Sequence, residues 1–313
     1  MPLRLVGAGM DAIRVDDLAQ TFLGRGNSAL GEHLNGHCIA VFSPMTFGLD
    51  AAIKNEIENL NEPDEDGRKP KRTDKLVVVL ETTGGFIEVV ERIVSVFRRH
   101  YKRVVFIIPN YAYSAGTVLA LSGDEIYMNY YSILGPIDPQ FPTEGGRSVP
   151  GMGYIAKYNE LRQIINSVPD DQVGSVRAEM SVLLRNFDQA KLFQIQQAIN
   201  HSKELVEEWL PKYKFRTWRT TESGKKVTPQ MRKDCARRIA AVLGDAEHWH
   251  SHGRGISMAE LSKPKIGLKV NDFGTDAMLN MHVTHYHGLF SDFMQSAHMK
   301  AAIHTRKRIR RLA

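Results

Sequence analysis

The sequence predicts an α/β fold, on the basis of two observations. Short continuous runs of valine, isoleucine and leucine recur along the first half of the chain, and segments with helical periodicity lie between them. Apolar runs without polar alternation are typical of parallel strands buried on both faces, and the helices between them supply the crossovers. We therefore expect a core built from a parallel β-sheet of βαβ units.

The expected elements of the first half follow in order. Helices are expected at Leu49–Leu60, Ile87–Arg99 and about Ala115–Leu121, and strands at Cys38–Phe42, Leu76–Leu80, Val104–Ile108 and around Ile126–Met128. In the second helix the apolar positions 87, 90, 94 and 97 share one face because they are spaced 3, 4 and 3 apart. The charged segment 61–74 is expected to be a surface loop, since the alternation resumes directly after it.

From about residue 151 onward the pattern becomes helical. Long helices are expected at Tyr154–Val168, Val176–Leu210 and Pro229–Leu243, a hairpin-like interruption at Tyr213–Thr228, and a terminal helix at Ala301–Leu312. We therefore expect an α/β core over residues 1–150. A mainly helical region over residues 151–313 is expected to pack on this core, either as a subdomain or as an oligomer-forming arm.

Composition excludes several classes of protein. The chain has 313 residues, of which 42% are apolar and 24% are charged, so disorder, collagen and a disulfide scaffold are excluded. Only Cys38 and Cys235 are present, which favours a reducing compartment. No apolar run approaches the ~20 residues that span a bilayer, and the first 20 residues lack the apolar core of a signal peptide. We expect a cytoplasmic protein without a membrane span.

The positive charge is concentrated at the end of the chain. The formal net charge is +6, and six basic residues follow the last acidic residue, Asp292, so the preceding part sums to zero. A neutral body does not resemble a nucleic-acid-binding domain, and we expect no nucleic-acid partner. For the basic tail Arg306–Arg311 we expect the solvated end of a helix, with contact to an anionic partner as the alternative.

Two loops that follow expected strands carry groups suited to chemistry. Glu81-Thr82-Thr83-Gly84-Gly85 follows the second strand, and the segment 109–117, which contains Ser114, follows the third. Both loops would lie at the carboxyl edge of a parallel sheet, where active groups gather. A glycine pair at a helix start can hold an oxyanion, and a nearby serine can be a nucleophile. A tight turn and a helix N-cap are the structural alternatives.

The segment 76–141 resembles the ClpP/crotonase superfamily. It carries, in order, E-T-x-G-G, A-x-S-A-G-T, A-L-S-x-D-E-I and G-P-I-D-P-Q. It is most similar to the serine dehydrogenase proteinase family of Clp-fold serine proteinases and to signal-peptide-peptidase-A-like proteases. The segment Trp249–Ser257 (WHSHGRGIS) resembles a second block of the former family.

The resemblance implies a serine peptidase of ClpP/crotonase-like fold that needs no cofactor. Ser114 would be the nucleophile, and the backbone N–H groups of Gly85 and Ala115 would form the oxyanion hole. Thr83 and Gly84 would bind a peptide or unfolded protein substrate as an added strand. The resemblance also implies that residues 1–150 are the catalytic core. The helical region 151–313 would complete the site and mediate homo-oligomerisation.

The general base has two candidates. The serine dehydrogenase proteinase family has the order Ser, Asp, His, which would assign Asp138 and His252. Signal-peptide-peptidase-like relatives use a Ser/Lys pair, which would assign Lys157, the only lysine between Ser114 and Lys191. A lysine base requires burial that lowers its pKa. We favour Ser114 with Asp138 and His252, and the lysine remains open.

Other functions are kept as alternatives. A crotonase-type acyl-CoA enzyme would use the same oxyanion geometry with carboxylates such as Glu81 or Glu88, and a catalytically inactive scaffold would keep only the fold. Histidines cluster at positions 248, 250 and 252 and at 282, 285 and 287, but no carboxylate or cysteine completes a recognised zinc spacing. We therefore expect no metal site.

Overall fold

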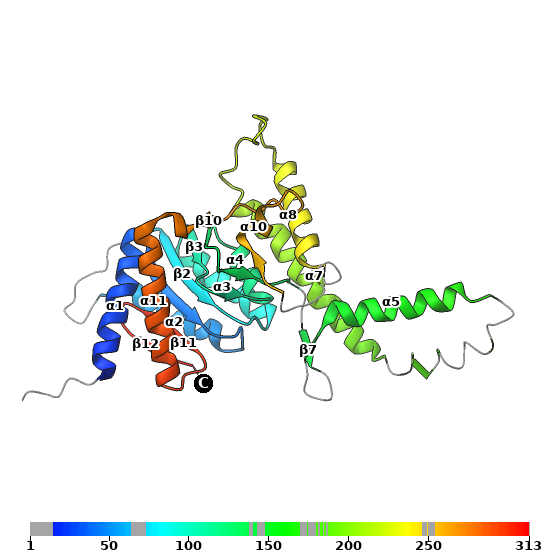
Figure 1. The fold of residues 1–313 in the computed structure, drawn as a ribbon, viewed down its shortest axis with the longest axis horizontal. Helices are drawn as coiled ribbons and strands as arrows, with labels where there is room; N and C mark the ends of the chain where they lie inside the picture. Colours follow the sequence, from blue (N-terminus) through cyan, green and yellow to red (C-terminus); the bar gives the residue numbers. More distant parts are fainter. Residues whose placement is uncertain are drawn as a thin grey trace, which may run out of the picture.

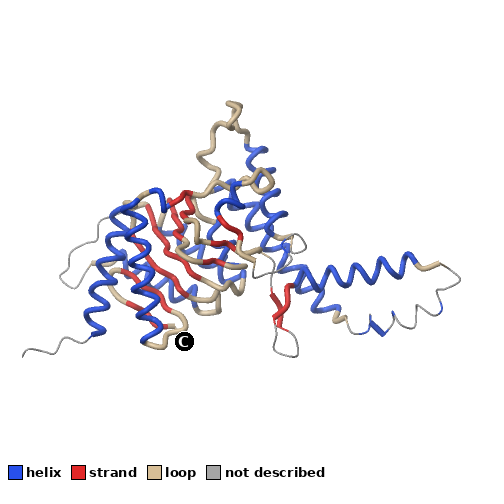
Figure 2. The backbone as a smooth tube through the Cα atoms, viewed as in Figure 1, coloured by secondary structure: helices blue, strands red, loops and turns tan. Residues whose placement is uncertain are grey.

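The predicted α/β class is confirmed in a computed structural model of the chain, which describes residues 15–63, 73–137, 140–142, 148–169, 174, 180, 182, 183, 185, 187–245, 249 and 254–312. In this part of the chain, seven strands form one sheet in the order β10-β5-β3-β2-β1-β11-β12 (Figures 1 and 2). The central strands β1, β2, β3 and β5 are parallel. Their carboxyl ends therefore meet at one edge of the sheet.

The first half of the chain alternates strand and helix as expected. The strands are β1(His37–Phe42), β2(Lys75–Glu81), β3(Arg103–Ile107), β4(Tyr111–Ala112), β5(Glu125–Met128) and β6(Ile133–Leu134). The helices are α1(Val15–His33), α2(Leu49–Asn61), α3(Ile87–His100) and α4(Ala115–Leu121). The predictions for α2, α3 and α4 and for the strands β1, β2, β3 and β5 are confirmed to within one or two residues at each end. Helix α1 was not predicted.

The remaining elements begin with two short strands and continue mainly as helices. They are β7(Gln140–Pro142), β8(Ser148–Pro150), α5(Gly151–Ser167), α7(Gln189–Lys212), α8(Pro229–Leu243), β9(Ile256–Ser257), α10(Met258–Ser262), β10(Asn271–Asp272), η1(Phe273–Thr275), α11(Ala277–Ser296), β11(Ala302–Thr305) and β12(Ile309–Arg311). The strands β10, β11 and β12 join the large sheet. The prediction of α8 is confirmed, and an isolated bridge between Thr220 and Lys226 confirms the hairpin-like interruption before it. Helix α11 was not predicted.

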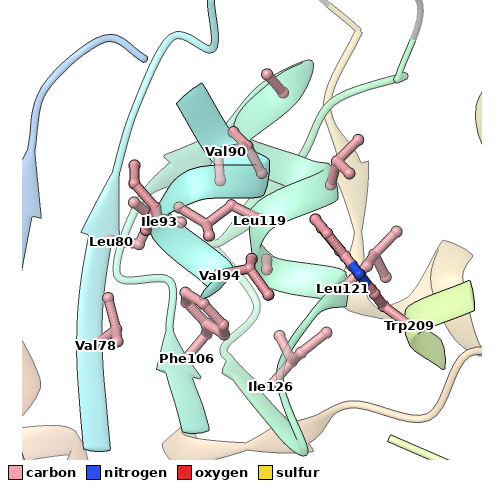
Figure 3. Close-up of a cluster of buried hydrophobic side chains, with 14 of the residues drawn as sticks. Val78, Leu80, Val90, Ile93, Val94, Phe106, Leu119, Leu121, Ile126 and Trp209 are labelled. Carbon is pink, nitrogen blue, oxygen red and sulfur yellow. The ribbon is translucent and has the colours of Figure 1, made fainter. Parts of the chain in front are cut away.

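Each central strand faces two apolar cores, because successive side chains point to opposite faces of a sheet. Val78 and Leu80 of β2 pack with α2, α3 and α4, whereas Val77 and Val79 pack with α1 and α11. Figure 3 shows the first core, in which Trp209 of α7 lies beside Leu121 of α4. The sheet is thus covered on both faces, which explains why its strands read as continuous apolar runs.

Helix α5 and the first half of α7 extend away from the body of the molecule (Figure 1). The ring of Tyr154 on α5 packs on Phe187, just before α7, with centroids 4.9 Å apart. The second half of α7 carries the buried Trp209 and Leu210 and joins the core. Within the described ranges, none of the helices combines the length and the apolar character needed to span a bilayer.

The predicted terminal helix over Ala301–Leu312 is wrong, because the end of the chain forms two strands. β11 pairs antiparallel with β1 on one side and with β12 on the other, and its four residues are buried. Pairing with the exposed edge of β1 satisfies the backbone groups of both strands. This long-range pairing outweighs the local helical pattern of the segment.

Part of the basic tail is neutralised inside the protein. Glu56 of α2, which is 1% exposed, lies 2.8 Å from Arg308 and 3.4 Å from Arg310. The Lys307 ammonium donates to the carbonyl of Asn59 at 2.6 Å. These side chains fasten the last two strands to α2, so the tail is not the solvated helix end that the composition suggested. A contact of this tail with an anionic partner stays a prediction.

Candidate active site

Ser114 lies in a strained turn between β4 and α4. Its backbone has φ 53° and ψ −122°, a combination that costs free energy for any residue other than glycine. The residue precedes α4, but its side chain does not accept a hydrogen bond from the first turn of that helix. The helix-cap alternative is therefore wrong. The residue is largely buried, with 7% of its surface exposed.

The glycine loop lies directly against this serine. Gly84 has φ 90°, and a Cβ atom there would lie 2.6 Å from the carbonyl oxygen of Tyr113 and 2.7 Å from the Cβ of Ser114. Gly85 has φ 145°, and a Cβ atom there would lie 2.5 Å from the carbonyl oxygen of Met45. Both positions require glycine, because the backbone conformation and the lack of space each exclude a side chain.

Two backbone N–H groups at this junction have no described acceptor. Ala115 is the first residue of α4 and has no partner within the helix. Neither its N–H nor that of Gly85 donates to another of the described residues, whereas the neighbouring Gly84 N–H donates to Thr82 Oγ1 at 3.0 Å. Two such donors beside a serine hydroxyl are the groups that a tetrahedral oxyanion requires.

The side chain of Thr117 links the serine turn to neighbouring segments by hydrogen bonds. Its hydroxyl is completely buried and lies 2.7 Å from the carbonyl oxygen of Ala112 and 2.9 Å from that of Gly135. It also accepts the N–H of Gly135 at 3.1 Å. Sequence reasoning did not assign a role to Thr117, although it is the last residue of the A-x-S-A-G-T pattern. The hydroxyl joins three segments that surround Ser114.

The glycine loop and the serine turn are also paired through their backbones. Thr82 donates its N–H to the carbonyl of Tyr111 at 3.2 Å, and Tyr113 donates to the carbonyl of Thr82 at 3.0 Å. The structure therefore brings together Ser114, Gly84, Gly85 and Ala115. Thr83 is exposed beside them, where an incoming chain could reach it.

The general base is not settled by this geometry. Asp138 and His252 lie outside the described residues. Lys157 is on α5, where its side chain is 59% exposed and its ammonium lies 2.9 Å from Glu160 of the same helix. The burial that a lysine base requires is not present at this position.

The second histidine cluster does not form a metal centre. In the part of the chain that the structure describes, no group of three His, Cys, Asp or Glu side chains could hold a metal ion. His287 instead lies 2.7 Å from Glu81, at the carboxyl end of β2. The two residues are 206 positions apart, so spacing along the sequence could not reveal this pair. Glu88, the other carboxylate considered for acyl-CoA chemistry, is exposed on α3.

Comparison with protein families supports the resemblance seen in the motifs. Residues 68–161 match the model of the ClpP-like SDH-type serine proteinase family. The match includes the glycine loop, the serine turn and Lys157. It confirms the ClpP-like resemblance of this segment and supports a serine peptidase.

Two archaeal proteins match this chain in sequence over a short segment. The uncharacterized proteins MJ1495 and MJ0137 of Methanocaldococcus jannaschii are 38% and 36% identical to this chain over 63 residues. Each match covers 20% of this chain and 22% of the relative. The matched segment therefore spans only about a fifth of the length of these relatives.

Solved structures of proteases show remote similarity. The 1510-N membrane-bound stomatin-specific protease is 19% identical with a TM-score of 0.29, over 38% of this chain and 56% of that chain. ClpP1 from Listeria monocytogenes is 10% identical with a TM-score of 0.36, over 82% of this chain and 94% of that chain. Neither similarity is close enough to bear on the site.

We predict that Gly84→Ala destabilises the protein far more than Gly224→Ala. Both glycines have positive φ, but nothing lies within 4 Å of the Cβ position at Gly224. In the control, Gly224→Ala, the free energy of unfolding should fall by about 1 kcal/mol through backbone strain alone. In Gly84→Ala it should fall by about 3 kcal/mol, because the added methyl group also collides with the serine turn. Urea unfolding of both variants measures the difference, and equal losses would contradict the close contact at Gly84.

Proposed function

We propose that the protein is a serine peptidase that forms an acyl-enzyme on Ser114. The observation that carries the proposal is the strained serine turn beside two available N–H groups, in a segment that matches a serine proteinase family. A strained backbone at a nucleophile is a recurring device that exposes the hydroxyl above a helix start. The same geometry supports the predicted roles of Gly85 and Ala115 as oxyanion donors.

The proposed reaction has two stages. The Ser114 oxygen attacks the peptide carbonyl, the base removes the hydroxyl proton, and the oxyanion accepts hydrogen bonds from Gly85 and Ala115 N–H. Such stabilisation commonly contributes about 3 kcal/mol per donor. The base returns the proton to the amine as it leaves. Water then hydrolyses the ester, with the same base removing its proton.

The substrate of this reaction is a peptide or an unfolded segment. An extended chain can pair beside Thr83, which is exposed, as an added strand does at a sheet edge. Gly84, the other predicted substrate-binding residue, is buried, with its N–H donating to Thr82 Oγ1 and its carbonyl accepting the N–H of Met45. In this arrangement the scissile carbonyl of the added strand lies next to Ser114. The proposed reaction needs no cofactor. The alternative of acyl-CoA chemistry gains no support, because Glu81 is paired with His287.

The assembly of the enzyme is part of the same proposal. The arm formed by α5 and the first half of α7 carries exposed apolar side chains, including Phe193 at 65% and Ile164 at 38% exposure. These side chains support the predicted homo-oligomer, in which the arm contacts a second copy.

We predict that a fluorophosphonate probe labels the protein stoichiometrically and that Ser114→Ala abolishes labelling. Ser122→Ala is the matched control, because Ser122 is a buried serine at the other end of α4. The control should be labelled at the rate of the unaltered protein, and intact-mass spectrometry measures both. Labelling that survives Ser114→Ala would refute the site. No labelling between pH 6 and 9, together with acyl-CoA binding, would indicate the crotonase alternative.

The base is identified by comparing His252→Ala with Lys157→Ala in the same labelling assay. We expect His252→Ala to lower the labelling rate at least about 100-fold, because loss of a general base commonly costs 10²–10⁴. Lys157→Ala should be labelled normally, since the exposed ammonium is paired with Glu160. The reverse pattern would assign the Ser/Lys pair, and Asp138→Asn should follow the effect of His252→Ala.

A further inference from the structure

A histidine–carboxylate pair joins α11 to the strand that leads into the glycine loop. His287 Nε2 lies 2.7 Å from Glu81 Oε2, and the two side chains are only 22% and 17% exposed. Glu81 is the last residue of β2 and immediately precedes Thr82. Its backbone carbonyl accepts the N–H of Ser43 at 3.2 Å, which ties the end of β2 to the residue after β1.

The same carboxylate lies near β4, since Glu81 and Tyr111 line one pocket. Burial first, and then the negative charge of Glu81, raise the pKa of the Tyr111 phenol. Tyr111 starts the short strand β4 that leads to Ser114. Glu81 and Tyr111 therefore lie near each other in the two strands that lead to Gly85 and Ala115.

His287 is held in place by its own helix. Its ring packs on Phe42 with centroids 5.5 Å apart, and Phe42 in turn packs on Phe290 of α11 at 4.8 Å. Phe290 is completely buried in the core beneath α11. Helix α11, which carries His287, lies beside α1 across one face of the sheet (Figure 1). The histidine is therefore attached to a packed helix.

Apolar packing does not fix the glycine loop on this side of the sheet. A pocket of about 270 Å³ opens between α11 and the loop, and its walls include Thr82, Thr83, Met294 and Gln295. Glu81 and Tyr111 line the same pocket. Beside this open space, a short hydrogen bond to a carboxylate is an additional contact that can set the position of the strand end.

We propose that His287 and Glu81 are positioning residues that hold the oxyanion hole in register with Ser114. This inference rests on the proposed function, because it assigns the pair a role in the acylation step. His287 orients the carboxylate, and the carboxylate fixes the ends of β2 and β4 relative to each other. The N–H groups of Gly85 and Ala115 are thereby held above the serine oxygen, where small displacements reduce the rate strongly.

The test compares three variants of the full chain. His287→Ala removes the donor, whereas His287→Gln keeps an N–H donor that can reach Glu81. His33→Ala is the matched control, because His33 forms a pair of the same kind, 2.8 Å from Asp276 at the start of α11, at a position outside the site. Fluorophosphonate inactivation gives the maximal rate, kinact, separately from the probe affinity. Hydrogen–deuterium exchange of segments 81–86 and 111–116 reports the loop without requiring activity.

We expect His287→Ala to lower kinact about 10- to 100-fold with little change in probe affinity, and to accelerate exchange in both segments. His287→Gln should recover most of the rate, and His33→Ala should match the unaltered protein in kinact and exchange. Unchanged kinact and exchange in His287→Ala would overturn the inference while leaving the peptidase intact. Equal losses in His287→Ala and His33→Ala would also overturn it, because they would indicate general loosening of α11. If the unaltered protein is not labelled, the proposed function itself fails.

Discussion

The close approach of the glycine loop to the serine turn is the constraint on which the rest of the site depends. Gly84 leaves no room for a Cβ atom between itself and Ser114, and Ser114 adopts a backbone conformation that costs free energy. Strain of this kind persists only where the surroundings enforce it. Here the backbone pairs between Thr82 and the serine turn, together with the buried hydroxyl of Thr117, hold the two segments together.

The sheet makes this approach possible. Parallel strands end at a common edge, so the loops that follow β2 and β3 are neighbours although helix α3 separates them along the chain. Helices on both faces bury the strands and keep that edge rigid. The strands β11 and β12 cover the outer edge of β1, and their arginines fasten them to Glu56. The last residues of the chain therefore stabilise the scaffold.

Sequence reasoning was most successful where structure depends on local pattern. The central strands and the helices α2, α3, α4 and α8 follow from apolar runs and periodicity. The short motifs also pointed to the neighbouring positions of the glycine loop and Ser114. Helix α11 was missed although its buried residues recur at helical spacing, at positions 279, 283, 286, 290 and 294. The terminal strands were missed because their pairing partner, β1, lies more than 250 residues earlier. The pair of Glu81 and His287 is equally non-local, so only the fold could bring it to light.

The central claim is that the N–H groups of Gly85 and Ala115 converge on the oxyanion formed at Ser114. A crystal structure of the fluorophosphonate adduct tests it most directly, since the phosphoryl oxygen takes the place of the oxyanion. The account predicts phosphorus bonded to Ser114 Oγ and that oxygen within about 3 Å of both nitrogens. An adduct whose oxygen points to solvent, or contacts neither nitrogen, would contradict it.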